Sequence, residues 1–143
     1  MFNLSDISKS FGRLRAVAPT DLHIPAGRTT VLIGPSGCGK STLLRLMNGL
    51  IAPDTGRITF DGEDVTAATA PSLRRRMGYV IQQGGLFPHL TTRQNITLMA
   101  RHTGWAAADI ETRLQSLTDL TRFPRDALAR YPAELSGGQR QRV

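Results

Sequence analysis

The sequence predicts an α/β domain, and three observations support this prediction. Residues 2–8 alternate apolar and polar side chains, as a half-exposed β-strand does. Residues 29–33 form an apolar run typical of a buried strand, and residues 43–49, after a glycine-rich loop, have the apolar spacing of a helix that ends at a glycine. Residues 86–133 have mostly helical patterns. We therefore expect an N-terminal antiparallel β region and a strand–loop–helix core into which a helical region is inserted.

Length and composition set limits on this domain. The chain has 143 residues, one domain's length at most, and its apolar content of 40% suffices for a buried core. It has neither a long apolar run nor the basic start and apolar centre of a signal peptide, so we expect a cytoplasmic location. The net charge of +7 comes from scattered residues apart from Arg74-Arg75-Arg76, which we interpret as a solvated helix end. We interpret the single cysteine, Cys38, as a small filler rather than a redox or metal residue.

Residues 34–42 fit the phosphate-loop pattern G-x-x-x-x-G-K-[ST] at every fixed position. Glycines let successive backbone N–H groups point at one anion. Lys40 adds a charge for the β- and γ-phosphates, Ser41 offers a hydroxyl to Mg²⁺, and Thr42 begins the following helix. The alternative is a glycine-rich turn with an incidental lysine, but the strand–loop–helix order favours the phosphate site. The predicted phosphate-binding residues are Gly34, Pro35, Ser36, Gly37, Cys38, Gly39, Lys40, Ser41 and Thr42.

The rest of the predicted β region contains two further candidate binding-site residues, Phe11 and Gln82. Residues 17–24 and 57–60 read as strands, the second followed by an Asp61-Gly62 hairpin turn, and residues 67–77 as a helix. Phe11 offers either an aromatic face for an adenine or a strand-end core residue, and both readings stay open. An apolar strand at residues 78–81 would place Gln82 at the sheet edge where α/β ligands bind, to accept from a metal-bound water or orient an attacking one. The alternative for Gln82 is a loop side chain that faces solvent.

The C-terminal half predicts helices with a second anion site. Thr91 or Thr92 caps one helix, residues 106–120 form another, and Trp105 between them is interpreted as a packing residue. Ser136 caps a third helix whose glycines expose N–H groups, which is either an anion site or a plain capped helix. This helix reaches Val143 without a stop signal, so we interpret the chain as the N-terminal part of a longer domain.

Together these residues resemble the nucleotide-binding subunit of ABC transporters over essentially the whole chain. The phosphate loop is followed, in the right order, by the family's signature motif, Leu135-Ser136-Gly137-Gly138-Gln139. Gln82 falls at the Q-loop glutamine, and Phe11 at the adenine-stacking aromatic, which is usually tyrosine in the family. The resemblance implies a P-loop NTPase (RecA-like) core with an antiparallel β region and a helical subdomain, truncated after the signature motif. It divides the chain into residues 1–85 (β region and core), 86–135 (helical subdomain) and 136–143 (start of the signature helix).

The resemblance also implies a mechanism. ATP and Mg²⁺ are the expected cofactors, with Lys40 and Gln82 as catalytic residues and Ser41 and Gln82 at the metal. Two such subunits pair head to tail, so that the signature residues of one cover the γ-phosphate bound by the other; here these residues are Ser136, Gly137, Gly138 and Gln139. Residues 82–92 would contact a membrane permease, and a periplasmic or lipid-anchored binding protein would act through that permease. The implied location is the cytoplasmic face of the plasma membrane, without nucleic acid as a partner.

The family also places an aspartate, a glutamate base and a switch histidine after the signature helix, and the 143 residues contain none of them in that place. We therefore expect this chain alone to be unstable and inactive as an ATPase.

Residues 78–91 and 130–132 look most like bacterial importers of quaternary amines such as glycine betaine, choline or carnitine. The alternatives are an importer of another small solute such as an amino acid, a non-catalytic remnant, and an ABC ATPase of DNA repair or translation. The last is disfavoured because the chain has no heptads and no linker to a second domain.

Overall fold

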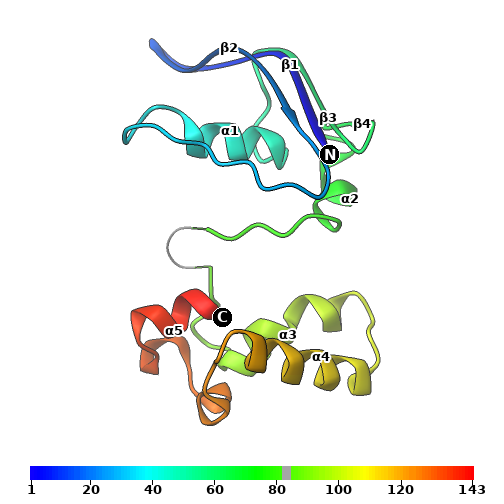
Figure 1. The fold of residues 1–143 in the computed structure, drawn as a ribbon, viewed down its shortest axis with the longest axis vertical. Helices are drawn as coiled ribbons and strands as arrows, with labels where there is room; N and C mark the ends of the chain where they lie inside the picture. The colour runs from blue at the N-terminus through cyan, green and yellow to red at the C-terminus, as the bar shows by residue number, and fades with distance from the viewer. Residues whose placement is uncertain (82–84) are drawn as a thin grey trace. The chain divides into compact units, whose positions relative to one another are not determined.

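The computed structural model describes residues 1–81 and 85–143 and divides into two compact units, Met1–Tyr79 and Val80–Val143 (Figure 1). The first unit contains β1 (Phe2–Phe11), β2 (Leu14–Ile24), α1 (Lys40–Met47), β3 (Thr55–Phe60), β4 (Glu63–Asp64) and α2 (Ala70–Arg74). The second contains α3 (Thr92–His102), α4 (Ala107–Leu120), the 3-10 helices η1 (Arg125–Ala129) and η2 (Pro132–Glu134), and α5 (Gly137–Arg142). None of the helices in the described parts of the chain combines the length and the apolar character that a membrane span requires.

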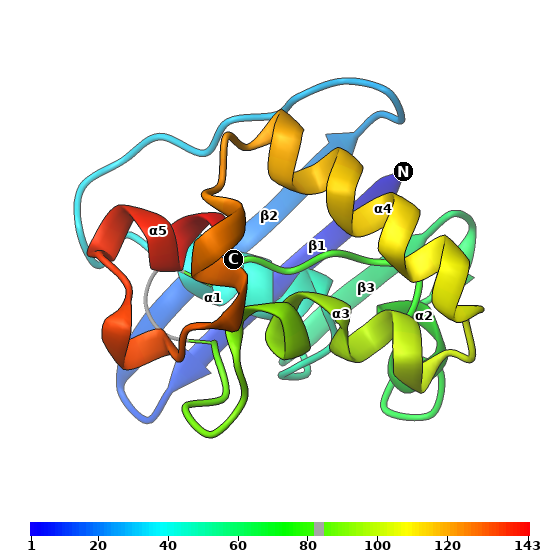
Figure 2. The same cartoon turned by 90° about the horizontal axis from the view of Figure 1, so that it is seen from below.

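The first unit is built on an antiparallel sheet, as the alternating N-terminal pattern predicts. The strand order is β2-β1-β3-β4, and Figure 2 shows the first three strands side by side. β1 pairs along its length with β2, from Phe2 opposite Ile24 to Phe11 opposite Leu14. The hairpin turn predicted between β3 and β4 is confirmed, because Asp61 and Gly62 both have positive φ there.

A bulge in β1 decides which of its side chains enter the core. Strict alternation would place the residue two positions after Leu4 on the same face of the sheet, but Asp6 has a φ of 48° and the register shifts between Leu4 and Ile7. Leu4 and Ile7 therefore both point inward, and Ile7 is fully buried. The polar Asp6 stays at the surface, where its backbone N–H donates to Asp21.

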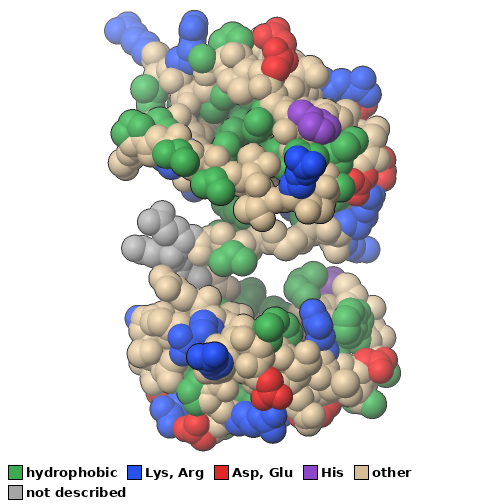
Figure 3. Space-filling model, in the orientation of Figure 1, with side chains coloured by type: hydrophobic (Ala, Val, Ile, Leu, Met, Phe, Trp, Pro, Cys, Tyr) green, Lys and Arg blue, Asp and Glu red, His purple; other side chains and the backbone are tan. Residues whose placement is uncertain are grey.

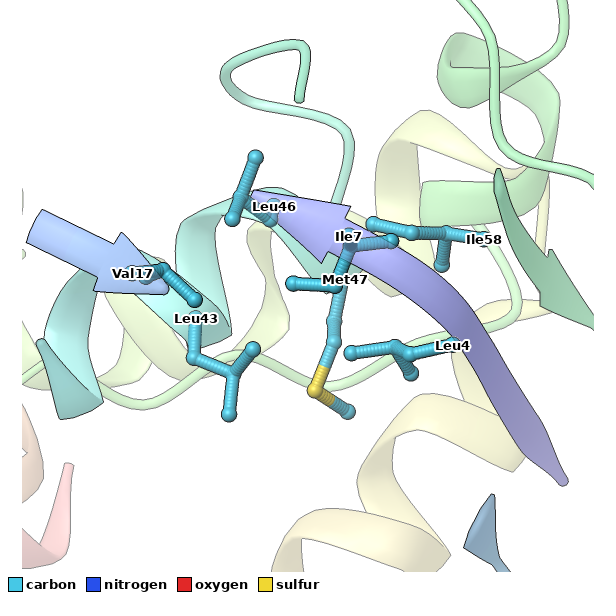
Figure 4. Close-up of a cluster of buried hydrophobic side chains, with 7 residues drawn as sticks. All are labelled: Leu4, Ile7, Val17, Leu43, Leu46, Met47 and Ile58. Atoms are coloured by element: carbon cyan, nitrogen blue, oxygen red, sulfur yellow. The ribbon is translucent and has the colours of Figure 1, made fainter. Parts of the chain in front are cut away.

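The core of this unit joins the sheet to α1. Leu46, the most deeply buried residue of α1, packs with side chains from β1, β2 and β3 (Figure 4). The whole cluster consists of Leu4, Ile7, Val17, Leu43, Leu46, Met47 and Ile58. Burial of the apolar stripe on α1 fixes this helix to one face of the sheet and with it the loop that precedes the helix.

The expectation of strands at residues 29–33 and 78–81 is wrong for this structure. Both segments lack strand pairing, and Val31, Ile33 and Val80 are 68%, 90% and 88% exposed. A strand needs a hydrogen-bonded neighbour, and among the described residues the sheet consists of β1–β4 alone. Apolar side chains therefore lie on the surface of the first unit, over α1 and the segment before it (Figure 3, green).

The second unit is helical, as expected. Thr91 caps α3, and its hydroxyl and the Gln94 side chain exchange hydrogen bonds with each other's backbone N–H groups. α3 and α4 lie side by side, with Leu114 buried, and Trp105 at the turn between them is half-exposed. A second core of Phe123, Ala127 and Leu135 supports the segment that leads to α5.

Three carboxylates on the first unit predict acid sensitivity. Hydrogen bonds from Lys9 and Arg57 hold the pKa values of Asp54 and Asp64 below the usual range, and the N-terminal ammonium does the same for the pKa of Asp61. Carboxylates with lowered folded-state pKa values stabilise the fold above the unfolded-state pKa, and this stabilisation is lost as the pH falls below about 4.

We expect the melting temperature of the chain, followed by circular dichroism, to fall between pH 5 and pH 3. The fall should be smaller in Asp64→Asn, which loses its ion pair with Arg57, than in the control Asp6→Asn, whose carboxylate forms no ion pair among the described residues. An equal pH dependence in the two variants would contradict this assignment.

Candidate functional site

The predicted phosphate loop forms a closed turn in front of α1. The Lys40 ammonium donates to the carbonyl oxygens of Gly34 at 2.8 Å and Pro35 at 2.7 Å, and it lies 3.3 Å from Cys38 Sγ. Cys38 Sγ occupies the space that a side chain on residue 34 would need, since a Cβ there would lie 2.6 Å from it. The lysine thus holds the loop together while its own charge stays at the loop, as a phosphate site requires.

Helix α1 begins at Lys40, two residues earlier than the sequence predicts, and Gly39 is its cap. The first helical hydrogen bond runs from Leu43 N–H to the Gly39 carbonyl, so the N–H groups of the first turn have no acceptor within the helix. No acidic residue lies in this turn, and the exposed Ser41 follows Lys40 directly. These donors, the helix dipole and the ammonium all favour an anion at the loop.

A backbone contact fixes this loop against the sheet. Gly39 has a φ of 97°, and a Cβ at this position would lie 2.2 Å from the Ala16 carbonyl oxygen of β2. No residue other than glycine fits such an approach without movement of the backbone. Gly37 also has a positive φ, of 83°, but a Cβ there would meet nothing within 4 Å.

Phe11 lies at the end of β1 and is 49% exposed, outside the buried core. It pairs with Leu14, which precedes Ala16 by two residues on β2. With a rise of about 3.3 Å per residue, the backbones of Leu14 and Ala16 are about 7 Å apart along β2. Phe11 and the start of α1 therefore approach neighbouring parts of the same β1–β2 hairpin.

The signature residues form a capped helix start, as predicted from Ser136. The Gln139 backbone N–H donates to Ser136 Oγ at 3.2 Å, and the Ser136 N–H donates to Gln139 Oε1 at 2.9 Å. The first helical hydrogen bond of α5 runs from the Arg140 N–H to the Ser136 carbonyl, so the N–H groups of Gly137 and Gly138 have no acceptor within α5. Both glycines are exposed.

The backbone of the apolar loop at residues 86–90 is held by Asn95, a residue that the sequence does not single out. Asn95 of α3 accepts from the Phe87 N–H at 2.8 Å and donates to the Leu90 carbonyl at 3.0 Å. Phe87 is 48% exposed and meets the His89 ring edge-on. Gln82, the predicted Q-loop residue, lies outside the described residues.

Among residues 1–81 and 85–143, no group of three His, Cys, Asp or Glu side chains is placed to hold a metal ion. A hydroxyl such as that of Ser41 is a hard oxygen ligand of the kind that Mg²⁺ accepts beside phosphate oxygens. The residues present therefore fit Mg²⁺ carried by a nucleotide.

The loop, the order of motifs and the fold define the class of this protein. A family model described as ABC transporter matches residues 17–143, most of the chain. The chain belongs to this family.

Three curated relatives illustrate the similarity. The osmoprotectant import ATP-binding protein OsmV of Salmonella typhimurium is 45% identical over 100% of this chain and 39% of its own length. The glycine betaine/carnitine/choline transport ATP-binding protein OpuCA of Bacillus subtilis is 45% identical over 100% of this chain and 38% of its own length. The sulfate/thiosulfate import ATP-binding protein CysA of Gloeobacter violaceus is also 45% identical, over 98% of this chain and 40% of its own length. The chain thus spans well under half the length of each relative.

Among solved structures, the ATP-binding cassette MJ0796, determined as a dimer in a post-hydrolysis state bound to ADP and Pi, superposes with a TM-score of 0.89. It is 27% identical, and the match covers 99% of this chain and 66% of that one. The predicted α/β P-loop fold with an antiparallel β region is confirmed.

The contact between Gly39 and Ala16 predicts that Gly39→Ala is far more damaging than Gly37→Ala. Both variants strain a positive φ, at about 1–2 kcal/mol, but only Gly39→Ala adds a backbone clash, which costs about a further 1–3 kcal/mol. Chemical denaturation of both variants measures the difference in the free energy of unfolding. Equal losses in the two variants would show that α1 does not rest on β2 in this way.

Proposed function

We propose that this chain binds ATP with Mg²⁺ and is the N-terminal part of a cassette that powers import of a small solute. The observation that carries the proposal is the loop at residues 34–42, where an ammonium, free N–H groups and the N-terminus of α1 converge. Lys40 would exchange two neutral carbonyl acceptors for anionic phosphate oxygens, whose opposite charge adds Coulomb attraction to the hydrogen bond. Ser41 would supply a ligand to Mg²⁺, which neutralises phosphate charge, and Phe11 would stack on the adenine.

The signature residues support a role in pairs of such cassettes. The cap between Ser136 and Gln139 pre-orders the turn, and the N–H groups of Gly137 and Gly138 remain as donors. We propose that they cover the γ-phosphate bound by a second, head-to-tail subunit. The structure of MJ0796 as a dimer bound to ADP and Pi supports the pairing of such cassettes.

Hydrolysis is proposed for the complete cassette. Gln82 would orient the attacking water and contact the metal, and the general base would come from a strand that the 143 residues do not contain after the signature helix. We also propose that the chain consists of three successive parts: residues 1–85 as β region and core, residues 86–135 as helical subdomain, and residues 136–143 as the start of the signature helix.

The membrane partner is proposed from the loop at residues 86–90. An exposed phenylalanine whose backbone is held by Asn95 of α3 is suited to a protein contact. We propose that this loop contacts a permease at the cytoplasmic face of the membrane, and that a substrate-binding protein acts through the permease.

The transported solute is proposed to be an osmoprotectant of the quaternary-amine class, because OsmV and OpuCA carry such names. A second candidate is another small solute, since CysA is equally identical and is named for sulfate and thiosulfate. Uptake assays with each solute in a strain that lacks this cassette separate the two candidates.

Substitution of Lys40 tests nucleotide binding. We expect the chain to bind ATP with Mg²⁺ in a calorimetric titration and Lys40→Ala to weaken binding at least about tenfold, because hydrogen bonds to charged groups are worth about 1.5–3 kcal/mol. Arg45→Ala, an exposed cation on the same helix, is the matched control and should bind as the unsubstituted chain does.

The same preparations test the enzyme assignment. We expect ATP turnover by the 143-residue chain to equal that of Lys40→Ala, because the base is supplied elsewhere. Binding that is unchanged in Lys40→Ala would refute the phosphate site, and turnover above the Lys40→Ala rate would refute the assignment of the base.

Substitution of Phe87 tests the membrane contact. We expect Phe87→Ser to abolish co-purification of the cassette with the permease subunits of an osmoprotectant importer while ATP affinity stays the same. Met99→Ser, which removes another exposed apolar side chain from the same unit, should keep the partner. Retention of the permease by Phe87→Ser would place the contact elsewhere.

A further inference from the structure

Lys9 and Asp54 form an ion pair next to Phe11 at the end of β1, and we call this pair the charged clamp. The Lys9 ammonium lies 5.7 Å from the centre of the Phe11 ring, within the range of a cation–π contact. The same ammonium donates to Asp54 Oδ1 at 2.7 Å. The Lys9 side chain is only 17% exposed, so this cation is held rather than free in solvent.

Both the side chain and the backbone of Asp54 form hydrogen bonds with the backbone of β1. Its Oδ2 accepts from the Ser10 N–H at 2.7 Å, and its own N–H donates to the Ser8 carbonyl at 2.9 Å. One residue further, the Thr55 hydroxyl bonds to the Ser8 hydroxyl at 2.8 Å. An isolated surface ion pair contributes little because its side chains are mobile, but here the carboxylate is held by two donors and a turn.

This clamp connects the two ends of the proposed site. Asp54 follows α1, the helix of the phosphate loop, by a short segment, and it grips the strand that ends in Phe11. The start of α1 is pressed against β2 by the contact between Gly39 and Ala16. Both ends of the loop–helix segment therefore touch the hairpin that carries the aromatic ring.

We propose that Lys9, held by Asp54, is a positioning residue for the nucleotide base: it fixes the Phe11 ring in the orientation on which the base stacks. This inference rests on the proposed function, since it concerns the base end of the same nucleotide site. The ammonium is attracted to the electron-rich ring face and restricts the ring before the base arrives, which lowers the ordering cost of stacking. Lys9 touches the ring and not the reacting phosphates, so its contribution is confined to ligands that carry a base.

The test compares ATP with inorganic tripolyphosphate, which has the phosphates but no base, by calorimetry in the presence of Mg²⁺ on the 143-residue chain. We expect Lys9→Met and Asp54→Asn to weaken ATP binding about two- to fivefold, in the range of one cation–π contact, and to leave tripolyphosphate binding unchanged. Lys9→Arg keeps a cation over the ring and should restore ATP affinity. Arg13→Met removes another exposed cation of the same hairpin and is the matched control.

Measurements in the Phe11→Ala background test whether Lys9 acts through the Phe11 ring. There, Lys9→Met should cause no further loss of ATP affinity, because the ring that it positions is gone. An equal loss for ATP and tripolyphosphate, or a loss that persists in Phe11→Ala, would overturn the positioning role.

A measurement on the unsubstituted chain covers the case in which a variant fails to fold. Proton NMR should show cross-peaks between the Lys9 ε-methylene and the Phe11 ring, and their absence would also overturn the inference. If the unsubstituted chain binds ATP no better than Lys40→Ala, the proposed function itself fails and the positioning role falls with it. Intact ATP binding with no effect of Lys9→Met removes only the positioning role.

Discussion

The packing of α1 on the antiparallel sheet is the constraint on which the rest of the first unit depends. Leu46 and Ile7 are completely buried at this interface, and Gly39 brings the start of the helix into backbone contact with Ala16. Burial of apolar side chains stabilises this packing, and the absence of a side chain at residue 39 allows the start of α1 to approach β2 closely. Because the loop at residues 34–39 leads into this helix and contacts β2 at Gly39, the core behind the helix helps to fix the position of the loop.

The residues proposed to bind nucleotide belong to two regions of the chain. The first unit brings the phosphate loop and Phe11 together, while Ser136 and the two glycines after it belong to the second unit. Each region is ordered by local hydrogen bonds. In the first unit they run from Lys40 to two carbonyl oxygens, and in the second unit they join Ser136 and Gln139 at the start of α5. Two half-sites of this kind suit a nucleotide that is held between two copies of a cassette.

The sequence predicts the elements whose causes are local. The phosphate loop, the cap at Ser136, the capped start of α3 and the turn at Asp61 all follow from residue types at fixed spacing, and the structure contains them. The strand at residues 29–33 fails because strand formation depends on a neighbour, which an apolar pattern does not specify. The roles of Lys9 and Asp54 were missed because their contact joins positions far apart in the sequence.

A direct test of the account is an NMR titration of the isotope-labelled chain with ATP and Mg²⁺. The account predicts that amide signals of residues 34–42 and the ring signals of Phe11 shift together, with one dissociation constant. Shifts confined to other residues, or a shift at the loop without any change at Phe11, would contradict a single nucleotide site built on α1 and the β1–β2 hairpin.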